Sequence, residues 1–321
     1  MSRRLCAVLA LALAPCAASA ADTVTLGLVA KLALQWPVYA AMEKGYFDRA
    51  GVKLDIVTTG GSAKAAQQLA AAAINIGEAG LPDLLRPIEQ GAPIKIIAYE
   101  VAEPPYKLVG RKDLRSLADL KGKKVMIGGT KDITLIYLEA LAKPAGLKPS
   151  DFDLLYAGAT TARLAALLSG GVDAAILTSP FEFQAIGQGY SDLGSVHKVL
   201  PGLPFTAYGV NTAWGPANRK TVVSFLRAVH QGTEWLYDAK NKDEALAILV
   251  KATGAKTEDA AKTYDLFFHE LRAFRRDGSM PVEGFRRLLD AVAELGDLPK
   301  PPPPEAKFVD DSYLKAAFAG R

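Results

Sequence analysis

The chain has 321 residues, of which 50% are hydrophobic, and carries a formal net charge of +4 with basic and acidic residues interspersed along its length. A chain of this size can bury a sizeable core and exceeds the usual size of one compact domain, so we expect two lobes. The interspersed charges give no indication of a nucleic-acid-binding surface, and we expect no nucleic acid among its partners.

The first twenty residues have the pattern of a secretory signal peptide. Two arginines precede an apolar run over residues 5–14, and Ala-Ser-Ala over residues 18–20 provides a small-residue cleavage site. We therefore expect a mature chain that begins at Ala21 in the periplasm. The start also resembles a twin-arginine signal, and residues 13–16 resemble a lipid-attachment box, so the export route and lipidation of Cys16 stay open.

Both cysteines, Cys6 and Cys16, lie in this leader. A mature chain would then have no thiol for a disulfide, a thiolate metal site or a cysteine nucleophile. The apolar run of the leader is too short to span a bilayer as a helix, and no later run of roughly 18 apolar residues follows it. We expect neither a metal nor a cofactor.

After the leader, short runs rich in β-branched residues alternate with alanine- and leucine-rich helical patterns, which favours an α/β architecture with mostly parallel strands. In the first section the predicted strands cover residues 24–29, 52–58, 74–77 and 94–99. The predicted helices cover residues 38–44, 63–73 and 82–90.

The same order of elements restarts after Gly122. It predicts strands over 124–127, 152–156 and 174–177 and helices over 133–142 and 162–169. Residues 69–91 align with residues 167–189 without a gap, and Pro82 then stands opposite Pro180. An internal duplication explains this match, with chance similarity between alanine-rich helices as the alternative.

From Pro216 the pattern changes to long helices, which we expect to cover one lobe from outside. These helices are predicted over residues 218–237, 243–252, 258–271 and 282–294. Consecutive prolines make the stretch 299–304 extended, and a last short helix is predicted over 312–318.

Several segments resemble a known family. Residues 39–47 (Tyr-Ala-Ala-Met-Glu-Lys-Gly-Tyr-Phe) and 50–52 (Ala-Gly-Val) are similar to the opening helix and turn of periplasmic solute-binding proteins of ABC transporters, of the nitrate/sulfonate/taurine and thiamine-pyrimidine-precursor types. Residues 117–125 and 171–175 resemble two further hallmarks of these proteins. The resemblance runs from about Thr25 to about Asn211 and thins in the helical part.

The resemblance implies a type II periplasmic-binding-protein fold, in which two α/β lobes with mostly parallel sheets flanked by helices close on a ligand cleft like a hinged jaw. We expect the first lobe to comprise residues 21–104 and 207–321, and the second 105–206. The two crossings are expected near 103–107 and 203–208. The implied function is to capture a small molecule, without chemistry, and to deliver it to an ABC importer permease. We expect the protein to act as a monomer.

In open parallel sheets, ligands bind beyond the carboxyl ends of the strands, where loops lead into helix N-termini. The loops in that position are 31–36, 60–62 and 80–82, facing 129–134, 158–161 and 178–180. The candidate ligand-binding residues, which include one from the second crossing, are Lys31, Trp36, Gly61, Ser62, Gly80, Leu81, Gly129, Thr130, Lys131, Thr134, Thr160, Thr178, Ser179 and Tyr208.

The chemistry of these loops favours a small organic anion or a polar aromatic compound. Gly128 and Gly129 allow close backbone approach, and Thr130 places a hydroxyl at the mouth of a helix. Trp36 offers a flat wall, or else packs in the core. The hydroxyls also serve as ordinary helix caps, and Lys31 and Lys131 are the only loop cations suited to an anion.

An enzyme on the same fold is the alternative, since some thiamine-pyrimidine synthases and chorismate dehydratases are similar to these binding proteins. The synthase reading implies an active-site histidine and a cysteine-rich iron site. The histidines of this chain are His197, His230 and His269, and none falls in a predicted cleft loop. Reporting to a membrane sensor instead of a permease is a third possibility.

Overall fold

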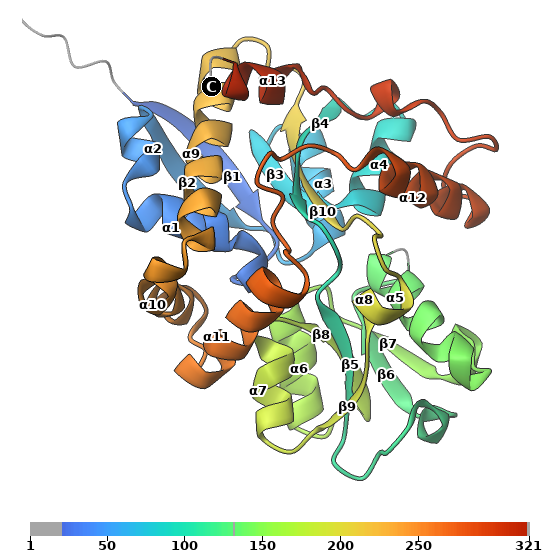
Figure 1. Ribbon diagram of the computed structural model, residues 1–321. Helices are drawn as coiled ribbons and strands as arrows, with labels where there is room; N and C mark the ends of the chain where they lie inside the picture. The colour runs from blue at the N-terminus through green and yellow to red at the C-terminus, as the bar shows by residue number, and fades with distance from the viewer. Residues whose placement is uncertain (1–20, 131, 320–321) are drawn as a thin grey trace, which may run out of the picture.

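The computed structural model describes residues 21–130 and 132–319, which form two α/β lobes, each built on a five-stranded sheet (Figure 1). The first sheet has the order β2-β1-β3-β10-β4. Its strands are β1 (Asp22–Leu28), β2 (Val52–Thr58), β3 (Ile76–Gly80), β4 (Ile94–Val101) and β10 (Thr206–Asn211). β1 runs parallel to β2 and β3, whereas β10 is antiparallel to β3 and β4.

The second sheet repeats this arrangement in the order β7-β6-β8-β5-β9. Its strands are β5 (Tyr106–Gly110), β6 (Lys124–Ile127), β7 (Asp153–Tyr156), β8 (Ala174–Thr178) and β9 (Ser191–Ser195). Here β6 is parallel to β7 and β8, and β5 is the antiparallel strand. Strand β9 was not predicted from the sequence, because the run Ser-Asp-Leu-Gly-Ser lacks the β-branched residues that are typical of a strand.

The connections between these strands are mostly helical, and their helices pack on the sheets. Those of the first section are η1 (Ala33–Gln35), α1 (Trp36–Glu43), α2 (Tyr46–Arg49), α3 (Ser62–Ala70) and α4 (Leu81–Glu89). Those of the second are η2 (Leu117–Leu120), α5 (Ile133–Ala142), η3 (Lys143–Ala145), η4 (Pro149–Asp151), α6 (Thr160–Leu168), α7 (Phe181–Gly187) and α8 (Val196–Val199).

The gapless alignment of the two sections coincides with equivalent elements. Ser62 begins α3 where Thr160 begins α6, and Ile76 begins β3 where Ala174 begins β8. The prediction of an α/β fold with two mostly parallel sheets flanked by helices is therefore confirmed. The chain passes from one sheet to the other after Val101 and returns before Thr206.

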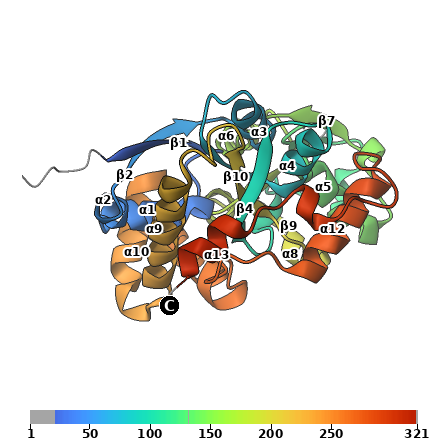
Figure 2. The same cartoon turned by 90° about the horizontal axis from the view of Figure 1, so that it is seen from above.

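The C-terminal part contributes α9 (Arg219–Tyr237), η5 (Ala239–Asn241), α10 (Lys242–Thr253), α11 (Thr257–Tyr264), the π-helical turn η6 (Asp265–Glu270), α12 (Val282–Glu294), η7 (Glu305–Lys307) and α13 (Ser312–Phe318). Helices α1, α9 and α13 pack on one face of the first sheet, and α3, α4 and α12 on the other (Figure 2). Within the described residues, no helix is both long and apolar enough to cross a bilayer.

We predicted that the C-terminal helices cover one lobe from outside. One part of this helical region instead reaches the second lobe. Helix α11 packs against α7, at the lower left of Figure 1. The reason is an aromatic cluster in which Trp36 makes edge contacts with Tyr264 and Phe268, with ring centroids 6.0 and 5.4 Å apart. Burying these rings draws α10, α11 and η6 into one core with the second lobe.

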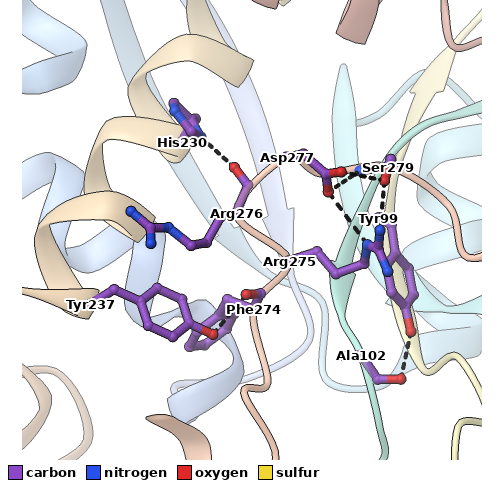
Figure 3. A network of polar contacts seen from close by, with 9 residues as sticks. All are labelled: Tyr99, Ala102, His230, Tyr237, Phe274, Arg275, Arg276, Asp277 and Ser279. Atoms are coloured by element: carbon purple, nitrogen blue, oxygen red, sulfur yellow. Dashed lines mark hydrogen bonds and ion pairs between the residues drawn. The ribbon is translucent and has the colours of Figure 1, made fainter.

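The segment after η6 crosses the open edge of β4 and shields it. The Tyr99 backbone N–H donates to Gly278 O at 2.9 Å, and the Ala102 N–H donates to Ala273 O at 2.6 Å. Figure 3 shows side chains that hold this segment, among them Tyr237, whose hydroxyl donates to Phe274 O at 2.7 Å. An exposed sheet edge invites pairing with other chains, so this covering protects the first lobe.

Candidate ligand-binding site

The two lobes meet around a small, partly open cavity of about 20 Å³, about the room one water molecule needs. Three helix N-termini surround it: Ser62 begins α3, Gly80 precedes α4, and Asp132 caps α5. The residues that line the cavity are Val29, Leu34, Ser62, Glu78, Gly80, Tyr106, Asp132, Ile133, Thr134, Gly158, Arg163, Phe205 and Thr206.

The facing loops touch each other directly. The Ala33 N–H of the first lobe donates to Ser179 O of the second at 3.1 Å. A Cβ atom added to Gly158 would lie 2.9 Å from Gly60 O, which is closer than a real Cβ atom comes to a carbonyl oxygen. The close approach of the two lobes thus requires glycine at position 158. Because the loop glycines have no side chains, the backbones of the two lobes contact each other across the gap.

Glu78 is a buried carboxylic acid at the wall of the cavity. Its Oε2 accepts hydrogen bonds from Gln35 Nε2 at 2.7 Å and from the Val29 N–H at 3.2 Å. Its Oε1 has no hydrogen-bond partner among the described residues. Burial raises the pKa of Glu78 to about 7, and the two hydrogen bonds oppose this rise in pKa.

Two further carboxyls approach each other from opposite lobes. Asp132 caps α5 by accepting from the Thr134 N–H at 2.9 Å and from the Thr134 hydroxyl at 2.5 Å. Asp83, in the first turn of α4, accepts from Arg86 Nη1 at 2.8 Å. The pKa of Asp83 is raised to about 7, first by burial and second by the negative charge of Asp132. Carboxyls of both lobes therefore lie beside the gap, with Asp83 paired to Arg86.

The cation in the cavity wall is Arg163, which is almost completely buried. Its Nε donates to Ile176 O at 2.6 Å, and its Nη1 to Ala157 O and Gly158 O, both at 2.8 Å. Nη2 donates to the Thr160 hydroxyl at 2.7 Å. These acceptors are neutral, and the guanidinium ties α6 to the middle of β8 and to the loop that precedes α6.

Three of the predicted site residues line the cavity: Ser62, Gly80 and Thr134. Ser62 Oγ accepts from the Gly80 N–H at 2.7 Å, and Thr134 Oγ1 accepts from the Gly128 N–H at 2.7 Å. Both hydroxyls thus stabilise the loops that form the walls.

Other predicted residues lie around the cavity without lining it. Gly61 faces Gly158 across the gap, and Thr160 holds Arg163. The Leu81 N–H donates to Phe205 O at 2.9 Å. The Thr178 hydroxyl donates to Pro105 O at 3.2 Å, and the Ser179 hydroxyl is bonded to Glu182.

The structure does not bring the remaining predicted residues to the cavity. Trp36 is fully buried in the aromatic cluster, and its indole N–H donates to Ala245 O at 3.1 Å. The Tyr208 hydroxyl donates to Glu100 at 2.6 Å. Lys31 borders a separate surface hollow beside Met42 and Lys251.

In the loop before α5, Thr130 is exposed and Gly129 is half-buried, and neither lines the cavity. Lys131 lies outside the described residues.

Three charged residues of the site, Glu78, Asp132 and Arg163, were not among the residues predicted from the sequence. The available signal was a charge inside an apolar element, because Glu78 follows Ile74–Gly77 and Arg163 interrupts an alanine- and leucine-rich helix. Charged residues are rarely buried unless they have partners or a function. The histidines do not line the cavity, and the described part of the chain holds no group of three or more residues suited to bind a metal ion.

Comparison with known families and proteins agrees with the resemblance noted in the sequence. A family model described as NMT1/THI5 like matches residues 35–244. A formylaminopyrimidine-binding protein of Halalkalibacterium halodurans is 27% identical over 219 residues, which are 66% of this chain and 65% of that protein. A 4-amino-5-hydroxymethyl-2-methylpyrimidine phosphate synthase of Saccharomyces cerevisiae is 26% identical, over 44% of this chain and 41% of its own length. Both matches span less than two thirds of the relative.

Among solved structures, the periplasmic nitrate-binding protein of Synechocystis superposes with a TM-score of 0.76 at 20% identity, covering 92% of this chain and 88% of its own. This likeness confirms the periplasmic-binding-protein fold.

Proposed function

Because this chain belongs to the NMT1/THI5-like family, we propose that it is a solute-binding protein of an ABC import system, which captures a small molecule between its lobes and delivers it to a membrane permease. The observation that carries the proposal is the cavity between the facing loops of the two lobes, which is lined by residues at the starts of α3 and α5, by the turn before α4 and by the buried Glu78. Ligands of open α/β sheets bind at this place, beyond the carboxyl ends of the strands where helices begin.

Ligand capture requires the lobes to move. The cavity of about 20 Å³ accepts a water molecule, so a larger solute enters only when the lobes separate. Once bound, the solute contacts loops of both lobes and so stabilises the closed form over the open one. The proposed moving units are residues 21–104 with 207–321, and residues 105–206, so opening would also separate α11 from α7.

For the solute itself, the relative named for formylaminopyrimidine favours a polar aromatic compound over a small organic anion. The proposed location is the periplasm, after removal of residues 1–20, and the proposed form is a monomer. A membrane permease is the proposed partner.

An enzyme on the same fold is the second candidate, because the yeast relatives are named as synthases. One observation at the site favours it: a carboxyl with a pKa of about 7, such as that of Glu78, is suited to accept and return a proton near neutral pH.

The test uses protein purified from the periplasm of expressing cells, with N-terminal sequencing to check that it begins at Ala21. It is screened by thermal shift against formylaminopyrimidine, 4-aminopyrimidine, nitrate, taurine and aromatic carboxylates. We expect one class to raise the melting temperature by mass action, and calorimetry to show one site per chain.

Each solute that binds is then incubated with the protein and analysed by mass spectrometry. An unchanged solute supports transport, whereas new products at many turnovers support the enzyme. If no compound in the panel alters the melting temperature, the proposal of a solute-binding protein for these classes is wrong.

A further inference from the structure

An arm made of α11 and η6, residues 257–270, is anchored to the first lobe and packs against the second (Figure 1). Within the arm, the ring centroid of Phe268 lies 5.4 Å from that of Trp36 in α1. Just beyond the arm, Ala273 O accepts a hydrogen bond from the Ala102 N–H at 2.6 Å. Because both anchors join it to the first lobe, the end of the arm is fixed to that lobe.

The last residue of the arm, Glu270, contacts a histidine of the second lobe. His197 lies in α8, directly after β9, and its Nε2 is 3.1 Å from Glu270 Oε1. The imidazole is only 10% exposed, and its Nδ1 is buried without a partner among the described residues. An N–H at Nδ1 would be unsatisfied, so the neutral imidazole carries its proton on Nε2 and donates it to Glu270.

Side chains do not fill the seam beside this hydrogen bond. A surface hollow of about 550 Å³ opens there between the arm and the second lobe. Besides His197 and Glu270, the charged or titratable groups that line it are Lys107, Lys198, Lys262, Asp265 and His269. Neither His197 nor Glu270 lines the small cavity between the facing loops. The hydrogen bond therefore joins the two lobes at a second place, where their packing is incomplete.

We propose that the arm is a latch, in which the hydrogen bond from His197 to Glu270 holds the second lobe in the closed arrangement from outside the cavity. This inference rests on the proposed function, in which residues 105–206 move against the rest of the chain. His197 moves with those residues and Glu270 stays with the first lobe, so opening separates the donor from the acceptor. Because the latch favours the closed form by itself, a solute that binds this form binds more tightly.

The test measures the distance between the lobes in protein without solute. Lys53→Cys and Asp153→Cys place one dye on each lobe at exposed positions, and a chain that begins at Ala21 has no other cysteine. Single-molecule Förster transfer between the dyes gives the ratio of closed to open molecules. In Glu270→Ala we expect this ratio to fall about three- to tenfold, because a hydrogen bond to a partly exposed carboxylate contributes less than a buried one.

Two further variants separate the hydrogen bond from a general loss of charge. His197→Ala should lower the ratio by a similar factor, and the double variant should lower it no further, since both changes remove the same hydrogen bond. Glu258→Ala is the matched control, because Glu258 is an exposed glutamate of the same arm that does not line the hollow. This control should keep the ratio of wild type.

An unchanged ratio in Glu270→Ala, or an equal fall in Glu258→Ala, would overturn the latch. Additive effects of the two single changes in the double variant would overturn it too, as would one interlobe distance that is the same in wild type and every variant. The measurement needs no solute, so its result is independent of the screening panel. If the panel fails to bind while the ratios change as expected, the solute-binding function is contradicted and the latch is not.

Discussion

Glu78 combines complete burial with a raised pKa, and both follow from its position in β3. The strand ends at the contact between the lobes, where little water reaches the carboxyl. Ionisation there is disfavoured by desolvation, the largest influence on the Glu78 pKa. The charge of Glu78 in turn raises the pKa of Tyr39, Glu100 and Tyr106. This residue therefore makes the ligand-free protein sensitive to pH.

Glu78→Gln is expected to change how the free energy of unfolding depends on pH. In the folded wild type Glu78 has a pKa of about 7, whereas in the unfolded chain its pKa is near 4.5. Between these two pH values the folded protein binds a proton that the unfolded chain has released, so the free energy of unfolding falls as pH rises from 4.5 to 7. Above pH 7 the variant should be the more stable protein, by on the order of 3 kcal/mol, and the difference should shrink towards pH 5. Urea unfolding at pH 5 and pH 8 measures both. If the free energy of unfolding depends on pH in the same way in both proteins, the raised pKa of Glu78 is contradicted.

Helix α6 shows how one side chain can hold an element at the site. Arg163 lies on the inner face of α6 and donates hydrogen bonds to the middle of β8, to the loop before α6 and to the first residue of the helix. Gly158, in that same loop, comes closest to the first lobe. The position of the loop, and thereby of the cavity wall, depends on this guanidinium.

Arg163→Met should destabilise the protein strongly while changing little volume. It leaves the carbonyls of Ala157, Gly158 and Ile176 without their side-chain donor, and each buried unsatisfied acceptor costs about 1–3 kcal/mol. We expect a loss of about 3 kcal/mol or more in the free energy of unfolding, measured by urea denaturation followed by circular dichroism. A loss below about 1 kcal/mol would show that the hydrogen bonds are dispensable.

The two lobes are connected in three ways. The chain crosses between the sheets twice, facing loops meet at Ala33 and Ser179, and α11 packs on α7 beside the aromatic cluster. Separation of the lobes must open the loop contact, where the backbones approach so closely that a Cβ on Gly158 would lie 2.9 Å from Gly60 O. The closed arrangement is therefore sensitive to small additions at that contact.

Gly158→Ala is expected to oppose closure without harming either lobe. Its Cβ would lie 2.9 Å from Gly60 O, so the loops must move apart, and overpacking of this kind costs about 1–3 kcal/mol. We expect ligand affinity to fall about tenfold with little change in the melting temperature of the ligand-free protein. Gly187→Ala is the control, because its Cβ would meet Asp259 at an ordinary 3.8 Å. Wild-type affinity in Gly158→Ala would contradict closure at this contact.

Most of the fold could be predicted from local patterns. The α/β class, the order of strands and helices and the repeated section follow from hydrophobic periodicity and turn residues, which act over a few neighbours. The family resemblance is likewise carried by short continuous segments, such as residues 39–47. The loops that would surround a cleft followed from the rule that ligands bind beyond the carboxyl ends of strands, and residues of five of the six predicted loops line the cavity.

Local sequence patterns did not predict which side chains line the cavity. Trp36 stands in a predicted cleft loop, yet its indole turns into a core completed by Tyr264 and Phe268, more than 200 residues along the chain. Glu78, Asp132 and Arg163 are distant in sequence and are brought together when the two lobes meet. Burial, hydrogen-bond partners and pKa are properties of an assembled environment, so they came from the packing of the lobes, whereas periodicity and composition were sufficient for the elements that the lobes contain.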